Sequence, residues 1–346
     1  MRAILVRRYG PPEVMEWKSA QDPQPGDGQV LVRVRAVGIN FAELLQRMGL
    51  YPGTPKPPFI PGLEVSGVVE QVRPARPPAQ EETNLRPGDR VVALSPFGAY
   101  AELVAVPAAT VFRLPDGISF VDAAAIPVNY VTAYHSMFHM GNIQPGDRIL
   151  IHGAAGGVGI AAIQLARARG LVTFGTAGPS KQDFLRQLGV DHPIDYSKDD
   201  FVAVARAAAP DGIEMVMDPI GGKSFPRSAK CLGPSGRLVV YGFSTAAGPE
   251  GKRSLWRGAR ALAQTPRFNP LTLMRNNLTV IGVHLGRMQG REALLRRQLE
   301  EIFRMYASGK VKPVVGKTFP IQQASEAHRY IHSRQNIGKV VLTISE

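Results

Sequence analysis

A glycine cluster, HGAAGGVG at residues 152–159, constrains the fold of this chain more than any other stretch. The aliphatic run 149–151 precedes it and a run with helical apolar spacing follows, which predicts a strand, a tight turn and a helix. Gly156 and Gly159 match the second and third glycines of the GxGxxG pattern, with Ala154 at the first position. The backbone can then approach a pyrophosphate, whose charge the helix N-terminus stabilises, whereas the alternative is a glycine-rich turn that binds nothing. We expect a dinucleotide to contact Ala155, Gly156, Gly157, Val158 and Gly159.

The second predicted strand, residues 171–176, indicates the type of nucleotide. It ends without the Asp or Glu that would hold an adenosine ribose 2′-hydroxyl, and Lys181 follows in the next loop. A hydrogen bond from a lysine to a 2′-phosphate contributes about 1.5–3 kcal/mol, so the sequence favours NADPH over NADH. The alternative for Lys181 is a solvated lysine at the start of a helix. We also expect cofactor contacts from Thr176 and from Tyr196, which could stack on the adenine.

Strands and helices alternate from residue 126 onward, a pattern that predicts repeated βα units. Such units form a doubly wound parallel sheet of the Rossmann type, whose strand ends face the ligand crevice. The residues that follow the late strands are therefore expected near the nicotinamide half of the cofactor. They are Tyr241, Gly242, Phe243, Ser244, His284 and Leu285.

The chain before residue 126 has the pattern of short strands between proline and glycine turns, which predicts a β-rich domain. A long amphipathic helix after His284 and a closing strand, GKVVLTI, are expected to rejoin that domain. The predicted α/β fold thus has a first domain at 1–125, completed by 285–346, and a cofactor domain at 126–284. A chain of 346 residues with 44% hydrophobic content can bury two such cores. We expect the chemistry between the two domains.

Composition restricts the partners and the compartment. Lys and Arg exceed Asp and Glu by 13, so the field of the protein would attract a polyanionic cofactor, anionic lipid or nucleic acid. A nucleic-acid partner is not expected, because the arginines are scattered and no nucleic-acid-binding motif is present. The single cysteine, Cys231, fits a reducing compartment, and no secretory signal is visible, so we expect a cytoplasmic protein.

Several motifs resemble one known family over nearly the whole chain. GINFAELLQRMGLYP, PGLEVSGVV, VNYVTAY and HGAAGGVGIAAIQLA are similar to the zinc-free quinone oxidoreductases of the medium-chain dehydrogenase/reductase superfamily. GVDHPIDY, IEMVMDPIGG and LMRNNLTVIGVHLG resemble most closely the vesicle amine transport protein homologues within that group. The resemblance implies a GroES-like catalytic domain beside the Rossmann domain, and a homodimer joined through the last strand of the cofactor sheet.

The zinc ligands of the zinc-containing relatives are missing from this sequence. Asn40 stands where those relatives have a cysteine, and Leu63 stands where they have the histidine of Gly-His-Glu. The cysteine-rich loop that holds structural zinc is also missing. Without three or four nitrogen or sulfur ligands, we expect no metal site and no alcohol oxidation by a Lewis-acid metal.

The chemistry that suits a nicotinamide cofactor without a metal is hydride delivery to a quinone or an α,β-unsaturated carbonyl. By resemblance, Asn40 lies at the nicotinamide end of the cleft and Tyr51 hydrogen-bonds or protonates the substrate. The ordinary pKa of tyrosine near 10 keeps Tyr51 protonated at neutral pH. The alternatives are that Asn40 satisfies turn backbone and that Tyr51 is a packed aromatic residue. The resemblance also places Thr132 along the pyrophosphate and nicotinamide channel, and Lys339 close to the same crevice.

A second class of function stays open from the sequence. The chain could be an NADPH-binding adaptor that acts at a membrane or with a partner protein and has little catalytic activity. A basic, amphipathic insert at residues 252–275 could dock weakly on anionic lipid. The alternative for this insert is packing against the cleft or the dimer partner, with its arginines solvated.

Overall fold

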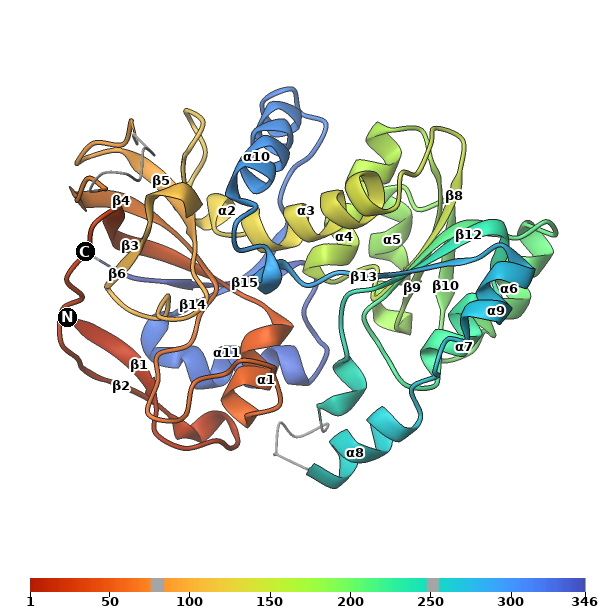
Figure 1. Ribbon diagram of the computed structural model, residues 1–346, viewed down its shortest axis with the longest axis horizontal. Helices are drawn as coiled ribbons and strands as arrows, with labels where there is room; N and C mark the ends of the chain where they lie inside the picture. The colour runs from red at the N-terminus through yellow and green to blue at the C-terminus, as the bar shows by residue number, and fades with distance from the viewer. Residues whose placement is uncertain (76–83, 248–254, 346) are drawn as a thin grey trace.

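The computed structural model describes residues 1–75, 84–247 and 255–345, which form two large sheets and a two-stranded ribbon. The first sheet and both chain ends lie on the left of Figure 1, and the second sheet lies on the right. The ribbon pairs β1 (Arg2–Val6) with β2 (Met15–Ser19) in antiparallel register. The predicted fold class, a β-rich unit beside a parallel α/β unit, is confirmed.

The first sheet has seven strands in the order β14-β15-β3-β4-β5-β7, and β6 also pairs with β3. Its central strand β3 is antiparallel to β4, β6 and β15. The last strand of the chain therefore lies beside one of the first, as the sequence predicts. The bounds are β3 Gln29–Ile39, β4 Glu64–Val72, β5 Arg90–Leu94, β6 Leu103–Pro107, β7 Val111–Arg113, β14 Val315–Pro320 and β15 Lys339–Thr343.

The second sheet has six strands in the order β10-β9-β8-β11-β12-β13, and every pair is parallel. The order reverses at β8 and β11, and ligands of doubly wound sheets bind at such a reversal. The strands are β8 Arg148–His152, β9 Val172–Ala177, β10 His192–Asp195, β11 Ile213–Asp218, β12 Leu232–Val240 and β13 Thr279–Gly282. The helices between them include α4 Gly157–Ala168, α5 Gln182–Leu188, α6 Phe201–Ala208 and α7 Ser224–Ala229.

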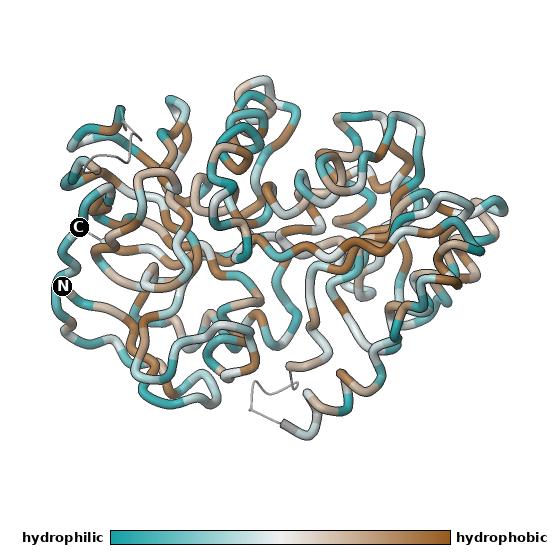
Figure 2. Tube along the Cα trace, in the orientation of Figure 1, coloured by the Kyte–Doolittle hydropathy of each residue, from teal (hydrophilic) through white to brown (hydrophobic). Residues whose placement is uncertain are grey.

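Burial on both faces explains why the strands of the second sheet read as continuous apolar runs. Ile149, Leu150 and Ile151 of β8 are all completely buried. Two of them belong to one core cluster and Leu150 belongs to another, because successive side chains of a strand point to opposite faces. Figure 2 shows the corresponding hydrophobic colouring along the strands of this sheet.

The remaining helices connect or flank the two sheets. α10 packs on α3, and its apolar side chains, among them Leu299 and Ile302, join the core cluster that also contains residues of α3 and α4. The segment after His284 is thus shared between the two sheets, and the domain boundaries given above stay a prediction. The bounds are α1 Phe41–Met48, α2 Phe120–Ala123, α3 Pro127–Tyr134, α8 Leu255–Ala263, α9 Pro270–Asn276, α10 Glu292–Ala307 and α11 Ala324–His332.

Candidate functional site

The glycine turn has the geometry that close backbone approach requires. Gly153, directly after β8, has φ of +64°, a left-handed conformation that favours glycine. A Cβ on Gly159 would lie 2.4 Å from the Gly153 oxygen, so this position needs glycine for the packing of α4 against the turn. A Cβ on Gly156 would meet only the Gly153 oxygen, at 3.2 Å. The backbone at Gly156 is therefore accessible, and α4, 12 residues long, begins beside it.

The end of the chain closes over this turn. The Gly338 N–H donates to the Ala155 oxygen at 2.9 Å, and Gly338 forms an isolated parallel bridge with Gly156. Gly338 has φ of +69°, and a Cβ there would lie 2.2 Å from the Val314 oxygen, so only glycine fits. The strand that completes the first sheet thus starts against the pyrophosphate-binding turn predicted for the second.

Two cations converge at the other end of the predicted cofactor site. The Lys181 ammonium donates to the Asn336 oxygen at 2.6 Å, which leaves two of its hydrogens for a ligand. Burial lowers the pKa of Lys181, and the positive charge of Arg334 lowers it further. A phosphate between Lys181 and Arg334 would relieve this repulsion. Sequence reasoning missed Arg334, because no local pattern places a residue so far along the chain beside Lys181.

Tyr196 flanks the same loop. Its side chain is 53% exposed, and a Cβ on Gly178 would lie 3.5 Å from its hydroxyl oxygen. The ring is therefore accessible at the loop that carries Lys181, as stacking on an adenine requires. Its contact with the cofactor stays a prediction.

A buried ion pair connects segments from both ends of the chain. The Lys339 ammonium lies 2.5 Å from Glu64 Oε1, and the two side chains are 2% and 0% exposed. The same ammonium donates to Asn40 Oδ1 at 2.5 Å and to Asn129 Oδ1 at 3.4 Å. Asn40 Nδ2 donates to Glu64 Oε1 at 2.9 Å, and Glu64 Oε2 accepts from the Val128 N–H at 2.8 Å.

These contacts use all three hydrogens of the Lys339 ammonium. Direct cofactor binding by Lys339 stays a prediction, and the geometry favours a different role, the positioning of Asn40. Asn129 extends the network to the glycine turn, because a Cβ on Gly157 would lie 2.3 Å from Asn129 Nδ2. Sequence reasoning missed Asn129, since an asparagine in a largely apolar helix carries no ligand signal by itself.

A second carboxyl group lies beside this pair. Glu43 Oε2 accepts from the Asn40 N–H at 3.0 Å, and Glu43 Oε1 accepts from Asn40 Nδ2 at 3.3 Å. Burial raises the pKa of Glu43 to about 8; Lys339 lowers it and Glu64 raises it. One ammonium does not compensate two buried carboxylates, so Glu43 retains its proton at neutral pH.

Tyr51 lies where the two sheets' loops meet. Its ring stacks at a tilt on His284, which follows β13, with ring centroids 5.3 Å apart. Tyr51 also shares a small apolar cluster with Leu45 of α1 and with Phe243, which follows β12. Burial, together with the carboxyl of Glu43, raises the pKa of Tyr51 to about 12. The hydroxyl is therefore a weaker acid than the value near 10 expected from sequence, and better suited to donate a hydrogen bond than a proton.

The other predicted contacts lie at the ends of the central strands. Thr176 Oγ1 is 3.0 Å from His152 Nδ1, so its side chain belongs to a buried hydrogen-bond chain of the sheet. Thr132 is buried on α3, one helical turn after Asn129. A Cβ on Gly242 would lie 2.9 Å from the Pro219 oxygen, which brings the loops after β11 and β12 together. Tyr241 and Ser244 follow β12, Leu285 follows β13 and Val158 lies at the start of α4; their cofactor contacts stay predictions.

Comparisons with known proteins identify the family. Residues 26–116 match the family model described as alcohol dehydrogenase GroES-like domain, and residues 188–342 match that described as zinc-binding dehydrogenase. The synaptic vesicle membrane protein VAT-1 homolog of Danio rerio is 39% identical over 344 residues, covering 99% of this chain and 70% of that protein. The chain belongs to the medium-chain dehydrogenase/reductase superfamily. The resemblance drawn from the sequence motifs is thereby confirmed.

Other members of the superfamily are similar along the whole chain. The human quinone oxidoreductase is 32% identical over 357 residues, covering 99% of this chain and 98% of that protein. The Escherichia coli quinone oxidoreductase, solved in complex with NADPH, is 29% identical with a TM-score of 0.86 and covers 99% of this chain and 100% of its own. The similarity therefore includes both sheets and the site between them.

Asn40 and Leu63 are the residues that stand, by the resemblance given above, where zinc-containing relatives have ligands. Asn40 is engaged with Lys339 and Glu64. Within residues 1–75, 84–247 and 255–345, no group of three or more His, Cys, Asp or Glu side chains could hold a metal ion. That the protein contains no zinc stays a prediction.

The raised pKa of Glu43 gives a prediction for stability against pH. The folded state holds this proton up to a pKa of about 8, whereas the ordinary value is 4.5, so stability falls as pH rises between these values. We expect the free energy of unfolding to decline by up to about 1.4 kcal/mol per pH unit in this window. Glu43→Gln should remove this decline in urea unfolding, while Glu300→Gln, at an exposed carboxylate, should keep it. Parallel pH dependences for the wild type and Glu43→Gln would contradict the assignment.

Proposed function

We propose that the protein is an NADPH-dependent oxidoreductase that transfers a hydride to a quinone or an α,β-unsaturated carbonyl. The observation that carries the proposal is the stacking of Tyr51 on His284. Through this contact the hydroxyl group of Tyr51, which belongs to the part of the chain that forms the first sheet, lies near the strand ends of the second sheet. The nicotinamide half of a dinucleotide is expected at those strand ends. Quinone oxidoreductases from Homo sapiens and Escherichia coli, to which the chain is similar, support the reaction type.

The chain has residues suited to bind each part of an NADPH molecule in turn. The accessible backbone of Gly156 and the start of α4 would hold the pyrophosphate. Lys181 and Arg334 would hold the 2′-phosphate, with Tyr196 beside the adenine. When bound, the cofactor supplies the hydride.

The protein contributes orientation and a hydrogen bond. The neutral hydroxyl of Tyr51 would donate to the carbonyl oxygen of the acceptor, and this bond strengthens as negative charge develops there. Asn40 is fixed by Lys339 and Glu64 before any ligand binds, so its position costs no reorganisation in the reaction. A quinone or an enone needs no Lewis acid for hydride addition, because conjugation already activates it.

The direct test is a steady-state assay of NADPH oxidation against a panel of quinones and enals. We expect turnover with members of at least one of the two classes. No NADPH oxidation above the uncatalysed rate with any acceptor would contradict the proposal and would favour the adaptor function.

We further propose a cytoplasmic homodimer. Its single thiol, Cys231, is buried, and no disulfide is required for the fold, as suits a reducing compartment. β13 ends the six-stranded sheet and leaves one edge without a described partner strand, which suits pairing with the same strand of a second copy.

The adaptor function is a second candidate, because α8 and α9 expose a run of large apolar side chains. Trp256 and Met274 are 82% and 74% exposed, and Leu262 and Leu271 are 69% and 68% exposed. Lys252 and Arg253 of the basic insert lie outside the described residues. Nothing in the part of the chain that the structure describes is both long and apolar enough, as a helix, to cross a membrane. Contact with a membrane would therefore rest on this exposed surface.

The first prediction from the proposed function concerns cofactor choice. Lys181→Ala should weaken NADPH binding about tenfold or more and leave NADH binding nearly unchanged, because the lost hydrogen bond is to a charged group. Fluorescence titration of both cofactors measures the two dissociation constants. Lys310→Ala removes an equal charge from an exposed site and should change neither. An unchanged NADPH constant in Lys181→Ala would remove Lys181 from the site.

The second prediction concerns Tyr51. Tyr51→Phe should reduce enone turnover by about tenfold to a hundredfold, because a donor at a developing oxyanion contributes a few kcal/mol. Quinone turnover should fall less, since a quinone can take its proton from solvent, and the NADPH dissociation constant should hardly change. A variant that reduces both acceptors like the wild type would make Tyr51 a packing residue.

The third prediction concerns the exposed apolar residues. Liposomes that contain phosphatidylserine should co-sediment the protein at low salt, and neutral liposomes should not, because basic residues near an anionic surface contribute about 1 kcal/mol each. Trp256→Ser together with Leu262→Ser should abolish the pelleting. Pelleting that is independent of lipid charge and salt would refute lipid docking.

A further inference from the structure

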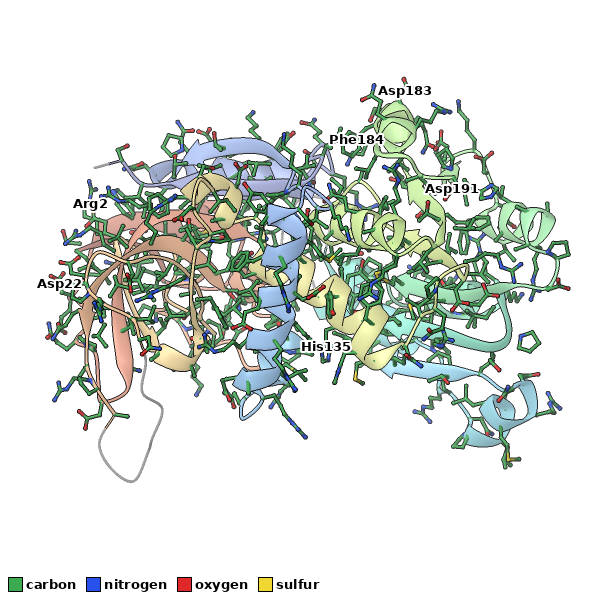
Figure 3. The ribbon with its side chains drawn as sticks, turned by 90° about the horizontal axis from the view of Figure 1, so that it is seen from above. Arg2, Asp22, His135, Asp183, Phe184 and Asp191 are labelled. Carbon is green, nitrogen blue, oxygen red and sulfur yellow. The ribbon has the colours of Figure 1, made fainter. Side chains whose placement is uncertain are left out.

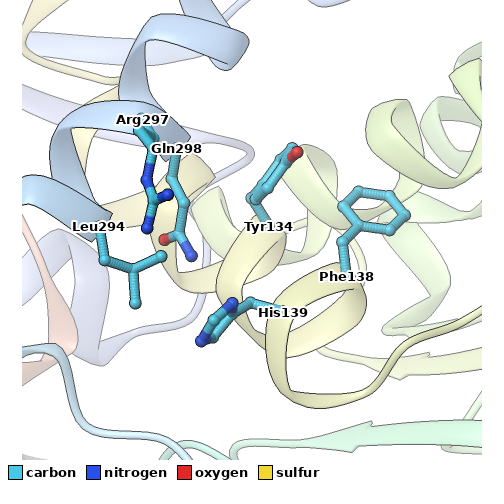
Figure 4. Close-up of a pocket in the computed structure, with 6 residues that line it drawn as sticks. All are labelled: Tyr134, Phe138, His139, Leu294, Arg297 and Gln298. Carbon is cyan, nitrogen blue, oxygen red and sulfur yellow. The ribbon is translucent and has the colours of Figure 1, made fainter.

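A groove lies between the segment that follows α3 and the start of α10, and His284 forms part of its lining. Its volume is about 490 Å³, which is within the range of small-molecule sites. An adjoining pocket of about 420 Å³ shares three of its lining residues, His139, Leu294 and Arg297. Figure 4 shows these side chains converging from the two helices.

The polar lining of the groove is entirely basic or imidazole. The residues are His135, His139, His284, Arg287, Arg291 and Arg297. Among the described residues no acidic side chain lines the groove, and the sequence between Glu250 and Glu292 contains no Asp or Glu. In the described part of the chain, no ion pair engages Arg287, Arg291 or Arg297. Three guanidinium groups of the groove lining thus have no ion-pair partner among the described residues.

The backbone builds one wall of this groove. α3 continues into a π-helix, His135–Met140, and such widened turns occur frequently at functional sites. The rings of His135 and His139 stack there with centroids 4.9 Å apart. Gln298 of α10 fixes the first of them, because its Nε2 lies 3.0 Å from His135 Nδ1. Figure 3 shows His135 where α10 crosses this part of the chain.

One residue links the groove to the proposed reaction site. His284 lines the groove, and its ring also stacks on Tyr51. Apolar side chains, including Met140, Val283 and Met288, line the groove between the arginines. An acceptor with its carbonyl at Tyr51 could therefore extend an apolar body past His284 and place a terminal group among the guanidinium groups.

We propose that this groove binds an anionic group of the acceptor, so that the substrate is a quinone or enone that carries a carboxylate, phosphate or sulfonate. Arginine is suited to this task, because its planar fork of N–H donors matches such groups with two parallel hydrogen bonds. The inference rests on the proposed function, since it names the substrate class of the same site. It is distinct from the site proposed for the cofactor's own phosphates, because none of Gly156, Lys181 and Arg334 lines the groove.

The test compares two enals that differ only in charge, cinnamaldehyde and 4-carboxycinnamaldehyde. We expect the wild type to have a kcat/KM for the carboxylate about tenfold or more above that for the neutral enal. Arg287→Gln with Arg291→Gln should lower the value for the carboxylate about tenfold, mainly through KM, and change the value for cinnamaldehyde less than twofold. The NADPH dissociation constant should stay unchanged.

A matched control distinguishes the effect of the groove arginines from the effect of the protein's overall positive charge. Arg304→Gln with Lys310→Gln removes one positive charge from the last turn of α10 and one from the segment just after it, where both side chains are exposed. This control should leave both enals unaffected. Equal losses in the groove variant and the control, or equal losses for both enals, would overturn the proposal.

A binding measurement keeps the inference separate from the proposed function. Calorimetry of each enal in the presence of NADP⁺ requires no turnover. Tighter binding of the carboxylate in the wild type, lost in the groove variant, supports the anion site even if no acceptor is reduced. Equal dissociation constants for the two enals in the wild type would overturn it, whatever the activity assays give.

Discussion

The structure depends on the buried ion pair of Lys339 and Glu64. An ammonium and a carboxylate removed from water are stable only when their geometry is good and their remaining hydrogen-bonding groups are satisfied. Here Asn40, Asn129 and the Val128 N–H supply those bonds. The pair thereby fixes the last strand of the chain, the first sheet and α3 relative to one another. Asn129 also lies against Gly157, so the same network helps to fix the position of the glycine turn.

Charged side chains have protein partners at the centre of the molecule but lack described acidic partners at the proposed ligand sites. Around Lys339, each buried charge has protein partners, and the surplus carboxyl of Glu43 keeps its proton. Around Lys181 and in the groove of α3 and α10, positive charges converge without described acidic partners. The first arrangement makes the region rigid and leaves little for a ligand to compensate. The second arrangement leaves positive charge that a phosphate or another anion can neutralise, as is expected of an anion-binding site.

Local patterns were sufficient for much of the fold. The glycine cluster, the alternation of strands and helices and the closing strand follow from periodicity and turn chemistry over short stretches, so they could be read without coordinates. The contacts and pKa values of individual side chains could not be predicted as well from the sequence. Lys339 was expected to lie close to the cofactor crevice; in the structure its three hydrogens are taken by protein oxygens, and contact with a cofactor stays a prediction. Tyr51 was expected with an ordinary pKa, and burial raises that pKa.

The amino-acid order alone determined the glycine turn, the two kinds of sheet and the membership in the superfamily, because each depends on residues close together in the chain or on whole-length similarity. Only the tertiary structure decided which distant residues meet. Arg334 lies near enough to Lys181 to lower its pKa, Asn129 accepts from Lys339, and Arg287 and Arg297 share a groove with His139. The physical reason is that such neighbours are selected by packing of helices and sheet edges, and packing leaves no short-range periodic signal in the sequence.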